Sequence, residues 1–336
     1  MRAETLELIK LKGRKIMRRL RHLAVVTTAT FLMTVVVMVA CSAPESQQGG
    51  NSNAAQSSGA TDWKAVGQAL GKEGSMQPGD VYKVSLPRSD LQVTVGGVAV
   101  KSALALGSWV AFKKMGDTAM VMGDLVLTED EVTPVMTKLQ EGGVMQTALH
   151  NHVLHESPRV MYMHINATGD AVKIAKAIHD ALSLSKTPFA APAAPPASSD
   201  QDLGIDTKQL DQIMGQTGKV NGGVYQFSVP RAETVSDNGM EVPPAMGVAT
   251  AINFQPTGGG KAAITGDFVL IASEVNPVIK ALRDNGIEVT ALHSHMLTES
   301  PRLFFMHFWA NDDAQKLARG MRSALDQMNI AKGQPK

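Results

Sequence analysis

The segment Gln146–Asp170, QTALHNHVLHESPRVMYMHINATGD, returns 143 residues later as Val289–Asp313, VTALHSHMLTESPRLFFMHFWANDD. Fourteen of the 25 positions are identical, and they include three histidines, one glutamate and one arginine in each copy. The chain has nine histidines, so these two copies hold most of them. A duplication that diverges elsewhere but retains its imidazoles and its carboxylate indicates a site rather than packing alone.

The sequence around each copy has the same order of expected elements. A short helix ends at Gly71 or Gly215, and an alternating strand ends in Pro-Arg. An apolar strand then leads to a helix with Pro134 or Pro277 in its first turn. Two strands carry the histidines, and a last helix starts near Asp170 or Asp313. This order predicts an α+β fold of two tandem homologous domains, each an antiparallel sheet with helices on one face, in a ferredoxin-like β-α-β-β-α order.

Two stretches of low complexity divide the chain. One is rich in Ser, Gln, Asn and Gly and predicts a flexible tether, and the other is rich in Ala and Pro and predicts an interdomain linker. The predicted divisions are a signal peptide (1–41), the tether (42–60), a first repeat domain (61–186), the linker (187–204) and a second repeat domain (205–330).

The first 41 residues predict where the protein is located in the cell. Basic residues are followed by an apolar run from Leu23 to Ala40, which ends at Cys41, the only cysteine of the chain. This pattern is typical of a lipoprotein signal peptide with Cys41 as the lipidated residue. The prediction is an extracytoplasmic protein anchored to a bacterial cell membrane, and the alternative is an uncleaved transmembrane segment.

Composition excludes some classes. The 336 residues are 44% hydrophobic, which is enough for two cores, and the net charge is +1. No basic stripe with interleaved aromatic residues follows the signal region, so we expect no nucleic acid as a partner.

The histidine spacing predicts a metal site. His150 and His152 lie two residues apart on a predicted strand, and so point to one face. His164 shares that face if cross-strand partners have residue numbers with an even sum, and Glu156 could then add an oxygen. The predicted metal ligands are His150, His152, His164 and Glu156 in the first copy and His293, His295, His307 and Glu299 in the second. Such ligands suit Zn²⁺ first, with Mn²⁺, Fe²⁺ or Cu²⁺ as alternatives.

Other residues of the motif leave alternatives open. Arg159 and Arg302 either bind a small anionic ligand or pair with the glutamate of their own turn. Asp124 and Asp267 follow a glycine and are expected to form a turn, with a place in the site as the second option. The histidines themselves could instead form a metal-free binding site or a structural network.

The two copies resemble the bacterial lipoprotein family called LppY/LpqO. The resemblance rests on Ala148–His152, Glu156–Arg159, Leu292–Met296 and Pro301–Asp313. It implies an exported protein with a tandem domain of no assigned function, so it carries over no catalytic residues. The first copy departs at Tyr162, Ile165 and Asn166, so either both repeats are functional or one is degenerate.

These observations predict a membrane-tethered lipoprotein with a transition-metal site in each repeat. The alternatives are a metal-free protein that binds an anionic component of the envelope, a metal-dependent hydrolase and a structural module. The sequence does not separate an enzyme from a binding protein.

Overall fold

The computed structural model describes residues 61–190 and 203–331. The predicted signal peptide with Cys41, the predicted tether and most of the predicted linker lie outside these residues. Both repeats belong to one compact unit, so the contacts between them are part of the fold. Within the described ranges, no helix is both long and apolar enough to cross a membrane.

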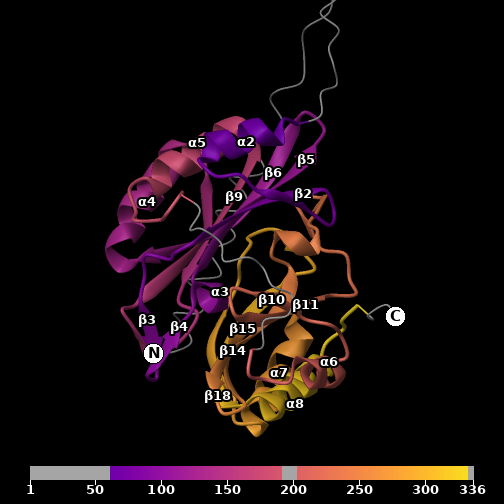
Figure 1. Ribbon diagram of the computed structural model, residues 1–336. Helices are drawn as coiled ribbons and strands as arrows, with labels where there is room; N and C mark the ends of the chain where they lie inside the picture. Colours follow the sequence, from indigo (N-terminus) through magenta and orange to yellow (C-terminus); the bar gives the residue numbers. More distant parts are fainter. Residues whose placement is uncertain (1–60, 191–202, 332–336) are drawn as a thin grey trace, which may run out of the picture. The chain divides into compact units, whose positions relative to one another are not determined.

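Each repeat contains helices and strands in the same chain order (Figure 1). Those of the first repeat are α2 (Trp63–Leu70), β1 (Ser75–Gln77), β2 (Val81–Pro87), β3 (Val93–Val95), β4 (Val98–Val100), α3 (Ser102–Ala105), β5 (Gly107–Met115), β6 (Thr118–Thr128), α4 (Glu129–Glu141), β7 (Met145–His150), β8 (Glu156–Ser157), β9 (Val160–Gly169) and α5 (Ala171–Leu182). Those of the second are α6 (Thr207–Met214), β10 (Lys219–Asn221), β11 (Val224–Pro230), β12 (Ser236–Asp237), β13 (Met240–Glu241), η1 (Pro244–Met246), β14 (Ala249–Gly258), β15 (Lys261–Leu270), α7 (Ala272–Asp284), β16 (Glu288–His293), β17 (Glu299–Ser300), β18 (Phe304–Asp313) and α8 (Ala314–Leu325).

The main sheet of each repeat has six strands, in the order β1-β2-β5-β6-β9-β7 and, in the second repeat, β10-β11-β14-β15-β18-β16. Neighbouring strands are antiparallel, with β9 between β6 and β7. Strands β6 and β7 therefore run parallel and are joined by α4, which is the split β-α-β order of ferredoxin-like folds. The prediction of two tandem α+β domains is confirmed.

Helices cover one face of each sheet, with α2, α4 and α5 on the first and α6, α7 and α8 on the second (Figure 1). The last helix begins where the sequence predicts it. The side chains of Asp170 and Asp313 accept hydrogen bonds from the backbone N–H three residues later. The helices α2 and α6 end at Gly71 and Gly215, whose φ angles of 82° and 74° favour glycine.

The opposite face of each sheet packs against the other repeat. A short arm of the first repeat, β3–β4 and α3, shares an apolar cluster with Val224 and Ala263 of the second. The matching arm of the second repeat, β12–β13 and η1, shares another cluster with Val81 and Ala111 of the first. Hydrogen bonds join the repeats in the same reciprocal way, from Lys83 to the Ala245 carbonyl and from Gln226 to the Ala103 carbonyl. We call this face of each sheet the inner face.

Two local predictions were wrong in detail. The helices with Pro134 and Pro277 begin at Glu129 and Ala272, so each proline lies in the second turn. Glu131 and Glu274 accept a hydrogen bond from the residue before the helix, and this fixes the earlier start. The strand predicted to carry both His150 and His152 ends at His150. The chain then turns away to form β8, which pairs with β3 of the arm.

Candidate metal centre

The histidines of the first repeat lie on the inner face of its sheet. His164 is in the middle of β9, opposite Asp124 of β6 and Ala148 of β7. His150 is the last residue of β7 and lies opposite Tyr162. These partners have residue numbers with an even sum, so His150 and His164 share a face, as the even-register prediction required.

The second repeat reproduces this geometry. His307 of β18 lies opposite Asp267 of β15, and His293 ends β16 opposite Phe305. His152 and His295 lie just beyond the ends of β7 and β16. The backbone carbonyl of His152 accepts a hydrogen bond from the Thr290 hydroxyl, which fixes this loop against the other repeat.

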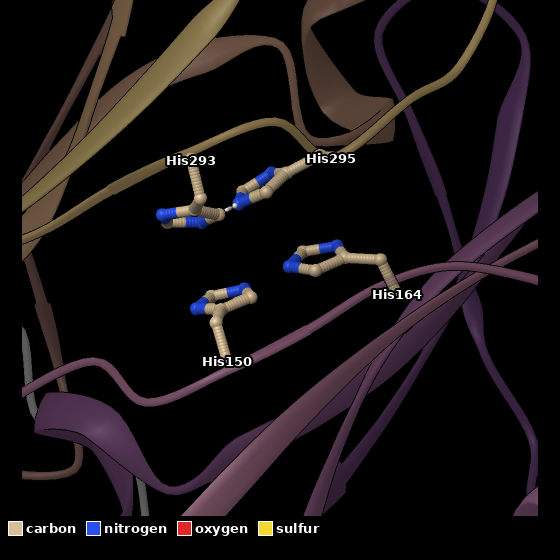
Figure 2. A group of neighbouring side chains, drawn as sticks. All are labelled: His150, His164, His293 and His295. Carbon is tan, nitrogen blue, oxygen red and sulfur yellow. Dashed lines mark hydrogen bonds between the residues drawn. The ribbon is translucent and has the colours of Figure 1, made fainter.

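The two histidine triplets meet, because the inner faces of the two sheets pack together. Ring centroids lie 3.6 Å apart for His150 and His293, 3.6 Å for His164 and His295, and 3.9 Å for His152 and His307. Four of these imidazoles face one another from strands and loops of both repeats (Figure 2). The sequence predicted a separate site in each repeat, and the structure brings the two triplets together. Alternation along a strand predicts which face a residue lies on, but it does not predict what that face packs against.

Two aspartates complete the cluster, which we call the histidine–aspartate centre: His150, His152, His164, His293, His295, His307, Asp124 and Asp267. Asp124 and Asp267 lie within strands β6 and β15, so the expectation of a turn was wrong. The Asp124 carboxylate lies 3.8 Å from Nε2 of His164 and 3.9 Å from Nε2 of His152. The Asp267 carboxylate lies 3.7 Å from His295 and 3.8 Å from His307. These distances are too long for direct hydrogen bonds.

A glycine precedes each aspartate for a steric reason. A Cβ on Gly266 would lie 1.9 Å from the Ala251 carbonyl oxygen, and one on Gly123 would lie 2.8 Å from the Trp109 carbonyl oxygen. Both contacts are closer than real Cβ atoms allow, so only glycine lets the neighbouring strands approach here. The duplicated Gly-Asp step inside an apolar strand was the signal in the sequence that pointed to these aspartates.

Buried polar atoms without partners gather in this centre. Among the described residues, seven of its nitrogen and oxygen atoms are buried and lack a hydrogen-bond partner. They are Oδ1 of Asp124, Oδ1 of Asp267, Nδ1 of His293 and the Nε2 atoms of His150, His152, His164 and His307. Each such atom costs about 1–3 kcal/mol when it is left unsatisfied. Seven together at one place indicate a ligand that supplies the missing interactions.

Two imidazoles are oriented by backbone carbonyls. Nδ1 of His307 donates to the Gly266 carbonyl at 2.7 Å, and Nδ1 of His150 donates to the Asn151 carbonyl at 3.1 Å. A carbonyl oxygen only accepts, so Nδ1 carries the proton and Nε2 presents a lone pair to the centre. This arrangement is typical of histidines that bind metal ions.

Burial also controls the protonation of the imidazoles. It lowers the pKa of His150 to about 4 and that of His307 to about 3, and it lowers the pKa of His152, His164 and His295 well below the usual value. At neutral pH these imidazoles are therefore neutral and able to bind a cation.

The pKa values of the two aspartates shift in the opposite direction. Burial raises the pKa of Asp124 to about 8, and the Lys83 ammonium opposes this shift. Burial also raises the pKa of Asp267, and the nearby Asp124 carboxylate raises it further. The two carboxylates thus face each other without enough positive charge to hold both in their ionised form.

Three groups of ligand atoms are compact enough to hold an ion. They are His150, His164, His293 and His295; His150, His152 and His307; and Asp267, His295 and His307. The atoms of each group lie within 4.8 Å of one another. Ligands about 2.0–2.1 Å from one zinc ion lie roughly 3.4 Å apart, so small side-chain movements would bring them to bonding distance.

Glu156 and Glu299, predicted as ligands, are placed elsewhere. Oε1 of Glu156 accepts a hydrogen bond from the Val160 backbone N–H, and Oε1 of Glu299 accepts one from Leu303. Neither glutamate belongs to a compact group of ligand atoms within the described ranges. Both close the turn that follows the histidines.

The two predicted anion-binding arginines also lie outside the centre. Arg302 pairs with Glu299 at 3.1 Å and donates to the Met296 carbonyl, which matches the second alternative for this residue. Arg159 is exposed and lies 3.7 Å from Glu129. The two guanidinium groups are bound by their own surroundings and do not converge on one ligand.

A small cavity adjoins the centre. It has a volume of about 10 Å³ and is lined by His164, His295, Trp109, Met122, Met246 and Met296, among other residues. This volume holds about one water molecule. It could admit a water-sized ligand to the His164–His295 pair, but not a polymer or a sugar.

Comparison with known proteins places the chain in a family. The family described as Domain of Unknown Function (DUF1259) matches residues 64–184 and again residues 208–327. The chain belongs to this family and contains its domain twice. No curated protein matches the sequence.

Two solved structures were also found. The crystal structure of a trimeric bacterial microcompartment shell protein, PduB, is 12% identical, covers 77% of this chain and 96% of its own, and has a TM-score of 0.21. The crystal structure of EtuB from Clostridium kluyveri is 9% identical, covers 75% and 90% respectively, and has a TM-score of 0.18.

Proposed function

We propose that this chain is an extracytoplasmic lipoprotein that binds divalent transition metal in the histidine–aspartate centre shared by its two repeats. Zinc is the first expected ion, with manganese, iron and copper as alternatives. The observation that carries the proposal is the set of seven buried nitrogen and oxygen atoms without partners at one place.

A cation fits these atoms better than other occupants do. The adjoining cavity of about 10 Å³ holds about one water molecule, which makes at most four hydrogen bonds and so leaves at least three of the seven atoms unsatisfied. An anion would meet the lone pairs of the imidazoles and two carboxylates. Divalent cations accept lone pairs from imidazole nitrogens and carboxylate oxygens, and they supply the positive charge that the aspartates lack.

The envelope location rests on the sequence. Cys41 ends an apolar run behind a basic segment, and both repeats resemble the LppY/LpqO lipoproteins. If Cys41 is the lipidated residue, a Cys41→Ala variant will leave the membrane fraction or remain as unprocessed precursor. Normal membrane retention of a processed Cys41→Ala protein would contradict this part of the proposal.

Metal binding is tested on the full chain, purified in detergent without a histidine tag. We expect elemental analysis by mass spectrometry to find bound transition metal, and a chelator to lower the unfolding temperature of the protein. His155→Ala is the matched control, because His155 belongs to the same segment but is exposed and lies outside the centre. Protein that contains no metal and gains no stability from added Zn²⁺, Mn²⁺, Fe²⁺ or Cu²⁺ would overturn the proposal.

A further inference from the structure

The duplication relates the three close imidazole pairs to one another. A shift of 143 residues converts His150 into His293, His152 into His295, and His164 into His307. The His150–His293 pair therefore maps onto itself. The other two pairs, His164–His295 and His152–His307, map onto each other. The centre has one middle pair and two equivalent outer pairs, and each pair takes one histidine from each repeat.

Two triplets within the compact ligand groups follow the same symmetry. His164, His293 and His295 lie within one group, which also contains His150, and His150, His152 and His307 form another. A third group, Asp267, His295 and His307, contains one histidine of each triplet. The duplication converts the first of these triplets into the second. The six imidazoles thus form two equivalent sets of three, and each set contains histidines from both repeats.

Each aspartate reaches both sets. Oδ1 of Asp124 lies 3.8 Å from His164, while its Oδ2 lies 3.9 Å from His152. From the other repeat, Oδ2 of Asp267 lies 3.7 Å from Nε2 of His295, and its Oδ1 lies 3.8 Å from Nδ1 of His307. Two atoms that bind one ion at 2.0–2.1 Å are at most about 4.2 Å apart, so the three separations that end at Nε2 suit two ligands of the same ion. The fourth ends at the nitrogen that donates to the Gly266 carbonyl, and it shows that Asp267 lies beside the His307 ring.

We propose, resting on the metal-binding function above, that the centre holds two divalent transition-metal ions bridged by the carboxylates of Asp124 and Asp267. One ion is bound by His164, His293 and His295, and the other by His150, His152 and His307. Each ion also receives one oxygen from each aspartate. The ions lie roughly 3.5–4 Å apart, the usual separation in two-metal sites. Neither repeat alone supplies a complete set of ligands.

The number of bound ions tests this arrangement. The full chain, purified in detergent without a histidine tag, is saturated with Mn²⁺ or Zn²⁺ and freed of excess metal, and the ions per chain are then counted. The inference requires two. One ion per chain would overturn the two-ion centre and leave the proposed function standing, whereas no ion would overturn both.

Electron paramagnetic resonance of the Mn²⁺-loaded chain supplies a second readout. Two carboxylate-bridged ions are magnetically coupled, so the spectrum of isolated Mn²⁺ should be absent. Two ions per chain with the spectrum of isolated Mn²⁺ would place the ions apart and overturn the bridge.

Variants then test whether the proposed histidine ligands give rise to the coupled spectrum. His295→Leu and, separately, its counterpart His152→Leu should each remove the coupled spectrum and lower the count below two, while His155→Ala keeps both. Circular dichroism checks that each variant is folded, and the wild-type count stands even if one variant is not. Folded variants at both positions that retain two coupled ions would overturn the assignment.

Discussion

Two kinds of buried polar cluster are built from duplicated residues, and they differ in how their polar atoms are satisfied. In the first repeat the Arg88 guanidinium is fully buried, and it donates to Glu131, to Asp90 and to the Val126 carbonyl. Arg231 and Glu274 form the same contact in the second repeat, at 2.6 Å. Glu131 and Glu274 each also accept two backbone N–H groups. These arginine–glutamate clamps find nearly all their partners within their own repeat. In the second clamp, Nε of Arg231 and Oε2 of Glu233 lack a hydrogen-bond partner among the described residues.

The histidine–aspartate centre is largely buried and equally duplicated, yet seven of its buried atoms lack partners among the described residues. Duplication and burial are therefore not what separates a structural polar cluster from a binding site. The difference is whether the protein itself satisfies the polar atoms. The clamp serves the stability of each repeat, and in the function we propose the centre is completed by bound metal.

The largest effect is expected from the clamp. Replacing Arg88 by Met leaves the Glu131 carboxylate buried without its partner, and this should lower the free energy of unfolding by about 3–5 kcal/mol. Denaturant unfolding of the metal-free protein measures the change. The paired variant Arg88→Met/Glu131→Leu removes both charges and should recover much of the loss. A loss below about 1 kcal/mol for Arg88→Met would show that the clamp is not a main source of stability.

A variant of the centre should leave the stability of the metal-free protein nearly unchanged and weaken metal binding. His164→Leu removes an unpartnered buried nitrogen, so the metal-free protein should keep its stability within about 1 kcal/mol. The stabilisation that added metal gives should fall by about 1.4–2.8 kcal/mol, which is a ten- to hundredfold loss of affinity. Unfolding with and without Zn²⁺ separates the two effects. If His164→Leu instead destabilised the metal-free protein as strongly as Arg88→Met, the centre would be a structural network.

Acid should lower the stability of the metal-free protein, because the same histidines bind protons when the chain unfolds. Their pKa values are near 6.5 in the unfolded chain and are lowered in the fold, to about 4 for His150. The unfolded chain therefore binds more protons below pH 6.5, and stability is lost as the pH falls towards the folded pKa. Asp124 and Glu156, whose pKa values are raised to about 8 and about 7, act in the opposite direction. The lowered pKa values of the six histidines outweigh the raised pKa values of Asp124, Glu156 and Asp267.

Stability should therefore fall between pH 7 and pH 5.5. Urea unfolding in the presence of a chelator measures it. Replacing His164 by Leu should reduce this acid-induced loss by about 1 kcal/mol, because one proton-binding group of the unfolded chain is gone. A pH dependence that is the same in wild type and in His164→Leu would mean that the buried histidines do not carry the effect.

The sequence predicted the fold because periodicity along the chain determines it, and it singled out the six histidines because the duplication retains them. Alternation in β9 gave the face of His164, and glycines gave the ends of α2 and α6. The prolines did not mark the first turns of α4 and α7. The joining of two triplets into one centre depends on how two sheets pack, and no local pattern encodes that. Asp124 was ranked below Glu156 because a Gly-Asp step usually marks a turn, whereas a glutamate near histidines resembles a ligand set. The aspartate lies between apolar residues of a strand buried on both faces, and that context was the stronger signal.

The smallest effect is expected where the sequence pattern and the structure disagree, at Glu156. The structure places this glutamate in the turn, with Oε1 bonded to the Val160 N–H. Burial raises its pKa to about 7, so the carboxyl group is already largely protonated in mild acid. Glu156→Gln keeps the acceptor oxygen and changes little else. The free energy of unfolding should therefore change by less than about 1 kcal/mol, and the number of bound ions should not change. Elemental analysis beside Asp124→Asn, which should lose metal, decides the matter. If Glu156→Gln loses an ion and Asp124→Asn keeps both, the ligands are those of the sequence pattern and not those of the inner face.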